Sequence, residues 1–418
     1  MTDHTKYLII GGGLAGGYAV QGIRKLDTSG RLVLVTEENE LPYDRVPLSK
    51  TYLAGRLSRE SVFLKKPDFY SEQRVEILAG RSASKLDISA RSLVISSPDG
   101  SSSEITFERL LLATGGRPKR LRIPGGDLSG VHYLRTIQDS ESIKFAMESS
   151  YKAVVVGGGF IGCEVAAALA SKGLQTTLLE LGQYVLNLAI DEETGRWITE
   201  FLTRNGVKVL TGTSASKILG NGGALTGVQT SANEIIEADL VVVGVGIQPN
   251  VELASEAGLR TDDGIVVNEY LETEVEGVFA AGDAARFYSP IFEKHLRVEH
   301  YDVAVKHGRL AGGNMAGQRQ AFSELPHFFS NLFNIRINVY GDMTERARKL
   351  RRGVPDFAKG GGFAQFYMRG DKRIGAFLEI GRPLDEVQTC RRLVSSRRVI
   401  EDPSRLSDES YDLNQLLT

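Results

Sequence analysis

The sequence predicts an α/β protein with two Rossmann-like dinucleotide-binding domains followed by an α+β C-terminal domain. Two glycine-rich turns, LIIGGGLAGG near the start and VVVGGGFIGCE after residue 150, each follow an apolar strand and open a helical run. Each turn is followed, about 20 residues on, by a strand that ends in a glutamate. A repeated segment, VEILAGRSASKL at 75–86 and VKVLTGTSASKI at 207–218, indicates an internal duplication.

The first turn contains Gly11, Gly13 and Gly16. Glycine lets the backbone approach a diphosphate at the start of a helix, where N–H groups and the helix dipole favour negative charge. The next strand, residues 31–36, ends at Glu37, which is placed to accept hydrogen bonds from an adenosine ribose. These residues predict the first dinucleotide site.

The second turn contains Gly157, Gly159 and Gly162, and the strand at 176–179 ends at Glu180. NADP sites offer arginine to the extra 2′-phosphate, whereas a carboxylate repels it. The stretch LLELGQY provides Glu180 and no basic residue. The second site is therefore predicted to prefer NADH to NADPH.

The rest of the chain completes the two units and adds a third domain. Each copy of the repeat is expected to run from a Ser-Ala-Ser-Lys turn through a hairpin to a buried strand, and these strands end at Thr114-Gly115 and at Gly244. A later apolar strand leads into Asp283. Beyond residue 321, strands are expected at 335–340, 363–368 and 374–378, before a charged helical end.

Composition narrows the setting of the protein. The formal net charge of -2 gives no whole-chain case for binding nucleic acid or an anionic membrane. The start has no signal-peptide pattern, and no apolar run is long enough to span a membrane. The two cysteines, Cys163 and Cys390, exclude a disulfide framework. A cytoplasmic location is predicted.

Five further motifs follow one another in the order in which a known family carries them. They are LPYDRVPLSK, LLATGGRP, VGVGIQPN, GVFAAGDAA and RVEHYDVAVKHGRLAGGNM. Together with the glycine turns, they resemble the FAD-dependent pyridine nucleotide oxidoreductases, in the branch of oxygenase-coupled ferredoxin reductases and apoptosis-inducing-factor-like flavoproteins. The resemblance implies a glutathione-reductase-type fold. It assigns 1–113 and 244–320 to the FAD domain, 114–243 to the NAD domain and 321–418 to an interface domain.

The resemblance also implies roles for individual residues. The first turn would bind FAD and the second NADH. Lys50 would lie near flavin N5 with Glu164 as its partner; the residues alone favour a solvated loop lysine and an ordinary helix acid, and the motif match reverses this preference. Phe160 would shield the flavin until nicotinamide arrives, or belong to the core.

Several positions are implied to contact FAD. Asp283 would contact the ribityl and diphosphate region, Arg45 and Arg135 the phosphates, and His300 and Tyr301 the pyrimidine end of the flavin. The other implied cofactor-binding positions are Leu14, Ala15, Ala83, Thr114, Gly115, Ile161, Gly244, Glu299 near the nicotinamide amide, and Phe329 near the flavin.

The electron acceptor is suggested by two features. The stretch LPYDRVPLSKTYLAG contains no cysteine, whereas disulfide reductases of the wider family carry a redox pair there. Electrons would therefore pass to a protein, a quinone-like acceptor or oxygen. Phe329 stands where relatives commonly carry tryptophan; it keeps a stacking face but loses the indole N–H and its easier oxidation.

A basic cluster between residues 344 and 373 is the second feature. Its members are Arg346, Arg348, Lys349, Arg351, Arg352, Lys359, Arg369, Lys372 and Arg373, with the acids Glu345, Asp356 and Asp371 among them. Such a patch would steer an acidic ferredoxin, or be an ordinary solvated face. Nucleic-acid binding is disfavoured because no aromatic residue interrupts ERARKLRRG.

The leading hypothesis is an NADH-dependent FAD oxidoreductase that passes electrons to a ferredoxin-type iron–sulfur protein. One alternative is an NADH dehydrogenase or oxidase acting on quinones, dyes or oxygen, which Phe329 favours. Another is an apoptosis-inducing-factor-like NADH sensor. A homodimer is left open.

Overall fold

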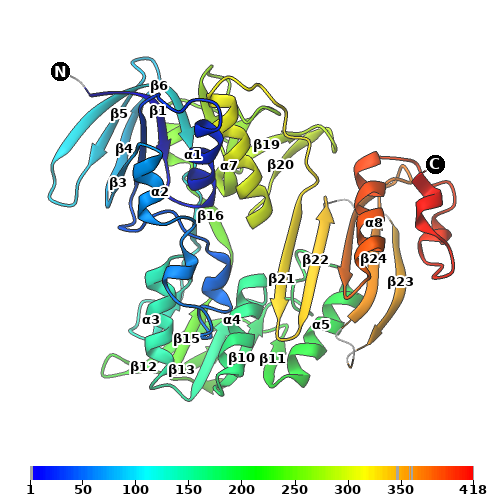
Figure 1. Ribbon diagram of the computed structural model, residues 1–418. Coiled ribbons are helices and arrows are strands. Elements are labelled where there is room, and N and C mark those ends of the chain that lie inside the picture. Colours follow the sequence, from blue (N-terminus) through cyan, green and yellow to red (C-terminus); the bar gives the residue numbers. More distant parts are fainter. Residues whose placement is uncertain (1–2, 345–347, 357, 359–360, 418) are drawn as a thin grey trace. The chain divides into compact units, whose positions relative to one another are not determined.

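The computed structural model describes residues 3–344, 348–356, 358 and 361–417. The chain divides into two compact units, each built from segments that are distant in the sequence (Figure 1). Unit 1 contains Met1–Asp44, Arg59–Arg117 and Gln248–Pro326, and unit 2 contains Arg45–Ser58, Pro118–Ile247 and His327–Thr418. The short strands β7 (Gly116–Pro118) and β16 (Ile247–Pro249) lie where the chain passes between units.

Unit 1 is built on a sheet with a parallel core in the order β3-β2-β1-β6, with β18 also parallel to β6. These strands are β1 (Asp3–Ile10), β2 (Leu32–Thr36), β3 (Val75–Ala79), β6 (Ser102–Leu112) and β18 (Val278–Ala280). The antiparallel strands β4 (Ser82–Asp87) and β5 (Ser92–Ser96) extend the sheet beyond β6.

Two helices of unit 1 pack closely through small residues. These are α1 (Leu14–Arg24) and α7 (Tyr301–Met315). A Cβ added at Gly308 would lie 2.3 Å from the Ala15 carbonyl oxygen, and one at Gly312 would lie 2.2 Å from that of Ala19. Such an approach leaves no room for a side chain, which explains the glycines of GRLAGGNM.

The remaining elements of unit 1 are short. They are η2 (Glu60–Val62), α2 (Pro67–Glu72), α6 (Glu252–Glu256), η3 (Gly282–Ala284) and a small sheet of β17 (Ile265–Val267), β19 (Ala285–Ser289) and β20 (Lys294–Arg297).

Unit 2 contains a second parallel sheet, in the order β11-β10-β9-β15-β8. Its strands are β8 (Val131–Tyr133), β9 (Lys152–Val156), β10 (Gln175–Glu180), β11 (Val207–Thr211) and β15 (Leu240–Val243). The helices are α3 (Ile137–Met147), α4 (Phe160–Ser171) and α5 (Glu192–Arg204), and an accessory sheet comprises β12 (Ala215–Asn221), β13 (Ala224–Thr230) and β14 (Ile235–Glu237).

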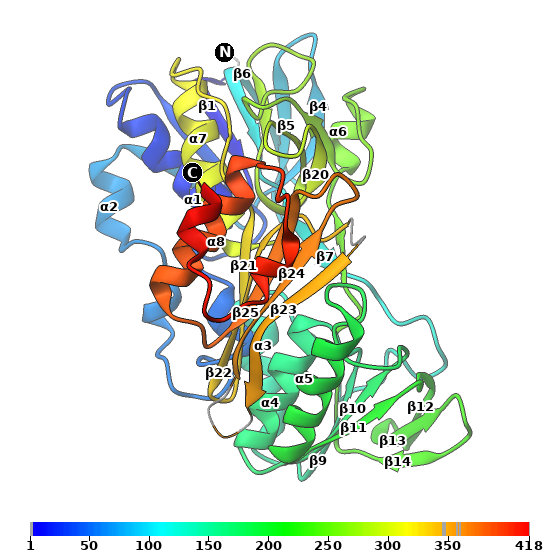
Figure 2. The same cartoon turned by 90° about the vertical axis from the view of Figure 1, so that its right-hand side faces the viewer.

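The C-terminal part of unit 2 is an antiparallel sheet in the order β21-β22-β25-β24-β23 (Figure 2). Its strands are β21 (His327–Leu332), β22 (Ile335–Gly341), β23 (Arg348–Asp356), β24 (Gly361–Met368) and β25 (Ile374–Ile380). It is followed by α8 (Leu384–Ser396), η4 (Pro403–Leu406) and η5 (Leu413–Leu417).

One face of this sheet shares a core with the helices of the parallel sheet. Ile337 and Leu378 belong to the same buried cluster as Val165 of α4 and Trp197 of α5. Trp197 also meets Phe363 edge-on, with ring centroids 5.5 Å apart. The interpretation of this tryptophan as a packing residue is confirmed.

Two expectations about local structure were incomplete or wrong. The Ser-Ala-Ser-Lys segments are not turns, because they lie within strands β4 and β12. In β4, the Ser84 hydroxyl donates to the Val94 carbonyl across the hairpin, so serine side chains that could have formed a turn bond across the ladder instead. Strands β21 and β23 were not predicted, because β23 is strongly basic and β21 carries adjacent phenylalanines without clear alternation.

Both cysteines are buried and reduced, as the sequence suggested for inert packing residues. Burial raises the pKa of the Cys163 and Cys390 thiols, which keeps them protonated and unreactive. Within residues 3–344, 348–356, 358 and 361–417, no helix is long and apolar enough to cross a membrane.

A fully buried histidine in unit 1 makes stability depend on pH. His307 on α7 lies edge-on to Phe287 and Phe322, and neither ring nitrogen has a hydrogen-bond partner among the described residues. Burial lowers the pKa of His307 from 6.5 to about 3. Between these values the unfolded chain binds the proton that the folded chain excludes, so the His307 contribution to stability is full above pH 6.5 and falls as pH decreases.

We expect His307→Leu to reduce this acid sensitivity. The free energy of unfolding of the parent should fall with decreasing pH by up to about 1.4 kcal/mol per unit more than that of the variant. Urea unfolding from pH 6.5 to 4.5 measures the two slopes. Equal slopes would show that His307 is not excluded from protonation in the folded state.

Candidate functional site

The first glycine turn, between β1 and α1, has the geometry that a diphosphate requires. Gly11 has a φ of +115°, and a Cβ there would lie 2.1 Å from the Ala113 carbonyl oxygen. A Cβ at Gly16 would lie 2.0 Å from the Gly11 carbonyl oxygen. Gly13, immediately before α1, has nothing within 4 Å of its hypothetical Cβ. The turn is tight inside and open at the start of the helix, which fits a diphosphate group.

The second turn, between β9 and α4, repeats this arrangement. Gly157 has a φ of +103°, and its added Cβ would lie 2.5 Å from the Gly244 carbonyl oxygen. At Gly162 the added Cβ would lie 1.8 Å from the Gly157 carbonyl oxygen, whereas Gly159 faces open space. Gly244, one of the implied cofactor-binding positions, therefore lies against this turn, whose open helix start has the same geometry as the first.

The two predicted ribose acids have different surroundings. Glu37 is exposed. Glu180 is only 9% exposed, and its carboxylate accepts from the Gly158 N–H at 2.6 Å, the Gly182 N–H at 2.6 Å and the Asn187 side-chain amide at 2.7 Å. Glu180 thus joins the glycine turn to the following loop, in addition to offering negative charge at the ribose position.

The remaining predicted residues of unit 1 lie on separate loops and helix starts. Thr114 donates its hydroxyl to the Asn250 carbonyl at 2.6 Å, and the Asn250 side-chain amide donates back to the Thr114 carbonyl at 2.9 Å. Gly115, which follows, has a φ of +64°. Ala83 is half-buried in β4, and Leu14 begins α1.

Asp283 and the start of α7 form another group in unit 1. Asp283 lies in η3, where a Cβ added at Gly282 would be 3.1 Å from the Ala15 Cβ. Glu299 forms an ion pair with Arg297 at 2.5 Å.

His300 precedes the first residue of α7, Tyr301. Burial, with Tyr18 nearby, raises the pKa of Tyr301 to about 12, so its hydroxyl stays neutral at the helix start. The start of α7 then offers the positive end of the helix dipole, beside the Asp302 carboxylate of its first turn, which pairs with Lys306.

Unit 2 contains a buried ion pair that the family resemblance implied. Lys50 Nζ lies 2.9 Å from Glu164 Oε1, with the two side chains 11% and 4% exposed. The 3-10 helix η1 (Val46–Ser49) has Pro47 in its first turn, and Lys50 follows it directly. Ser140 of α3 fixes this loop by donating to the Leu48 carbonyl at 2.9 Å. The pair is therefore held in place by the 45–58 loop and by helix α4.

Aromatic rings surround the pair. Lys50 Nζ lies 5.0 Å from the centroid of the Phe329 ring, and Arg336 Cζ lies 4.4 Å from the same ring. Phe160, at the start of α4, meets Phe328 edge-on with centroids 4.7 Å apart. Both assignments made for Phe160, gate or core, are compatible with this half-buried position. The neighbouring Ile161 is 46% exposed.

The two predicted phosphate arginines meet within unit 2. Arg45 donates through Nη1 to the Arg135 carbonyl at 2.7 Å. The predicted site residues therefore form two groups. Unit 1 contains the first turn, Glu37, Ala83, Thr114, Gly115, Asp283, Glu299, His300 and Tyr301; unit 2 contains Arg45, Lys50, Arg135, Phe160, Ile161, Glu164, Phe329, Glu180 and the second turn.

The basic cluster is largely neutralised. Arg351 forms an ion pair with Glu193, and Arg352 is buried against Glu386. The other paired cations are Arg369 and Arg373 with Asp371, and Lys372 with Glu401. Arg348 and Lys349 are exposed. Arg346, Lys359 and Glu345 lie outside the described residues. The interpretation as a strong steering patch is weakened, because most of the described charges have local partners.

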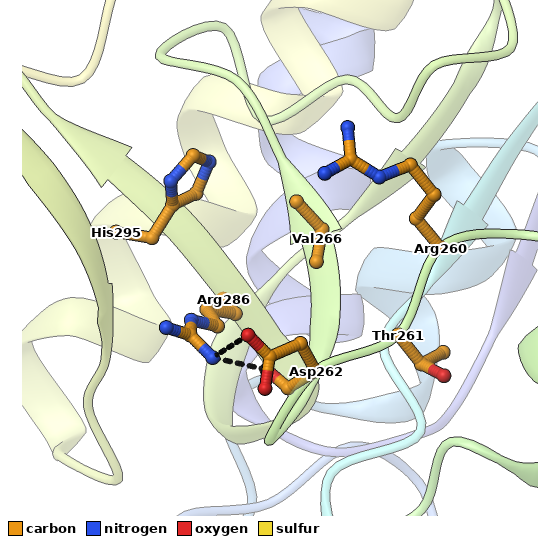
Figure 3. A pocket seen from close by; sticks show the side chains of 6 residues that line it. All are labelled: Arg260, Thr261, Asp262, Val266, Arg286 and His295. Atoms are coloured by element: carbon orange, nitrogen blue, oxygen red, sulfur yellow. Dashed lines mark hydrogen bonds and ion pairs between the residues drawn. The ribbon is translucent and has the colours of Figure 1, made fainter.

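Unit 1 also contains a surface pocket. Arg260, Thr261, Asp262, Val266, Arg286 and His295 line it, on and beside β17, β19 and β20 (Figure 3). Asp262 pairs with Arg286, so one of the two arginines is already neutralised. None of the predicted cofactor-binding residues lines this pocket.

Sequence reasoning missed four hydrogen-bond donors of the site, three polar side chains and one backbone N–H. Ser49 donates to Glu164 Oε2 at 2.5 Å and Ser330 to Glu164 Oε1 at 2.6 Å. Gly182 and Asn187 complete the contacts of Glu180. The only available signal was a small polar residue within an apolar stretch, in PLSK and HFFSN, and such residues are too common to single out.

Comparison with known proteins gives matches over the whole chain. The model of the pyridine nucleotide-disulphide oxidoreductase family matches residues 5–308, and a reductase C-terminal family matches residues 327–417. Putidaredoxin reductase CamA of Pseudomonas putida is 32% identical, with 100% of this chain and 98% of that protein covered. The ferredoxin–NAD(+) reductase subunit of the benzene 1,2-dioxygenase system of Pseudomonas putida is 33% identical, with the same coverage.

Solved structures agree with these matches. The ferredoxin reductase for the CYP199A2 system of Rhodopseudomonas palustris has a TM-score of 0.91 and 30% identity, with 100% of both chains covered. A covalent putidaredoxin reductase–putidaredoxin complex gives a TM-score of 0.91 and 32% identity, covering 99% of this chain and 98% of that one. The α/β fold predicted from the sequence, with its C-terminal domain, is confirmed.

Proposed function

The chain belongs to the pyridine nucleotide-disulphide oxidoreductase family, and we propose that it is an NADH-dependent flavoprotein that reduces a ferredoxin-type iron–sulfur protein. Relatives of nearly the same length that are named as reductases of ferredoxin-type proteins support this function. The observation that carries the redox chemistry is the buried Lys50–Glu164 pair beneath Phe329. A charge pair is costly to bury, and a redox site gives a reason for keeping it.

The residues fit the two cofactors. The open starts of α1 and α4, at Gly13 and Gly159, would each hold a diphosphate, with FAD at the first and NADH at the second. When bound, FAD supplies the chemistry that takes two electrons from NADH and returns them singly. Glu180 would hold the adenosine ribose of NADH and disfavour NADPH.

The chain itself would supply orientation and charge. Lys50 would place an ammonium group near the reacting ring, and Glu164 would hold that ammonium in position. Phe329 and Phe160 would provide apolar faces that exclude water from the reacting rings. Asp283 and the α7 start at His300 and Tyr301 would contact FAD in unit 1.

The acceptor has a second candidate. Phe329 replaces the tryptophan expected at this position, which favours direct oxidation by quinones, dyes or oxygen over delivery to a protein. The stretch LPYDRVPLSKTYLAG, which has no cysteine, is compatible with both acceptors. The two buried free cysteines favour a reducing compartment, and we place the protein in the cytoplasm.

Anaerobic reduction by NADH, followed by rapid mixing with an acidic [2Fe–2S] ferredoxin, a quinone or oxygen, tests the acceptor. We expect the ferredoxin to reoxidise the flavin fastest. Reversing the charge of Arg348 and Lys349 should slow this step less than tenfold at low salt, because exposed charges are screened and few here are unneutralised. Faster reoxidation by quinone or oxygen would favour the alternative enzyme, and a persistent charge-transfer band with every acceptor would favour a sensor.

A further inference from the structure

Three segments of unit 2 converge on one buried carboxylate. Glu164 of α4 receives Lys50 Nζ at 2.9 Å and the Ser330 hydroxyl at 2.6 Å on Oε1, and the Ser49 hydroxyl at 2.5 Å on Oε2. Ser49 is 2% exposed, Ser330 0% and Glu164 4%. Ser49 and Lys50 belong to the 45–58 loop, Glu164 to the parallel-sheet domain, and Ser330 to β21.

The two serines restrict the orientation of the carboxylate, which the lysine alone does not. A carboxylate that contacts a single ammonium group can still rotate about its last bond. Hydroxyl donors on both oxygens fix the plane of the carboxylate. They also satisfy lone pairs that burial would otherwise leave without partners. Lys50 then needs to donate only one of its three N–H groups to Glu164.

The β-sheet register explains why Ser330 can do this. In β21, successive side chains alternate between the two faces of the sheet. Phe329 pairs across the ladder with Asn338 and Ser330 with Ile337, whose side chain belongs to the buried cluster shared with α4. Ser330 therefore points toward α4 while Phe329 takes the opposite face, where Arg336 covers its ring. One dipeptide supplies a donor to Glu164 and the ring near Lys50.

We propose that Ser330 and Ser49 are positioning residues that orient Glu164, and through it the Lys50 ammonium, so that the C-terminal sheet controls the charge presented at the redox site. This inference rests on the proposed function for its meaning in catalysis, but its physical content is the coupling of both hydroxyls to Lys50. Without one hydroxyl, the buried carboxylate loses part of its stabilisation. The lysine then loses its fixed partner.

Competitive acetylation of the holoenzyme measures this coupling without relying on turnover. Acetic anhydride reacts with the neutral amine, and mass spectrometry of the Lys50 peptide gives its labelling rate at a fixed pH. We expect Ser330→Ala and Ser49→Ala to raise that rate about tenfold, because an amine that is no longer held against an oriented carboxylate is freer to react. Reduction of the flavin by NADH should slow about tenfold in parallel, as for loss of one hydrogen bond to a charged group.

Two further variants separate positioning from packing. Ser330→Cys keeps nearly the same volume but is a weak donor, so it should fold normally and still raise the labelling rate of Lys50. Ser171→Ala, which removes a hydroxyl on the same helix that donates to the Ala167 carbonyl at 2.7 Å, should change neither quantity.

An unchanged Lys50 labelling rate in both Ser330→Cys and Ser49→Ala would overturn the proposal, even if thermal stability fell. Failure of the ferredoxin assay alone would contradict the proposed function but leave the change in labelling rate, so the two proposals can be told apart.

Discussion

Replacing Lys50 by alanine is expected to slow reduction of the flavin by NADH about 100-fold, the usual scale for removing one preorganised charged donor from an active site. The ammonium is nearly buried, 2.9 Å from Glu164 Oε1, and faces the Phe329 ring. Stopped-flow absorbance under anaerobic conditions measures the step directly. The FAD content of the purified variant checks that the rate change does not come from cofactor loss.

A matched control contacts the same loop from a neighbouring helix. Lys144 of α3 lies with its Nζ 4.3 Å from the centroid of the Tyr52 ring, so Lys144→Ala removes a cation that contacts the 45–58 loop and leaves the Glu164 pair in place. Its flavin reduction should stay within about twofold of the parent, as expected for loss of a contact worth about 0.5 kcal/mol. An unchanged rate of flavin reduction in Lys50→Ala, or an equal loss of rate in Lys50→Ala and Lys144→Ala, would contradict a specific role of Lys50 in flavin reduction.

The glycine turns could be predicted because their chemistry is local. At Gly11 and Gly157 the positive φ and the close carbonyl leave glycine as the fitting residue, and a helix begins directly after Gly13 and Gly159. A local pattern of strand, turn and helix records all of this. The α/β fold followed from the same patterns.

The rest of the site depends on contacts between distant segments, and no local pattern records them. Ser330 meets Glu164 across 166 residues of sequence, and Ser49 meets it across 115. The interpretation of the basic cluster as a steering patch was weakened for a similar reason, since two of the acids that pair with it, Glu193 and Glu386, come from helices elsewhere in the chain. The assignment of Lys50 to Glu164 came from a family resemblance, which carries long-range information that spacing lacks.

Glu180 illustrates how one residue can be predicted for part of its role. The sequence identified it as the acid that selects NADH. The structure adds that the carboxylate bridges the Gly158 and Gly182 N–H groups and the Asn187 amide. Removing its charge to admit the 2′-phosphate of NADPH would therefore also disturb the turn that holds the diphosphate.

We accordingly expect Glu180→Gln to weaken NADH binding by about 10- to 100-fold, the cost of losing a hydrogen bond to a charged acceptor and of facing an NH₂ group toward an N–H donor. NADPH should not become an efficient substrate. The ratio of NADH to NADPH affinity should therefore fall mainly because NADH binds more weakly. Flavin reduction rates measured against the concentration of each nucleotide give both affinities, and Glu234→Gln, at an exposed position of the same domain, is the control. A variant that bound NADPH as well as the parent binds NADH would show that the charge of Glu180 selects the cofactor and that its backbone contacts are dispensable.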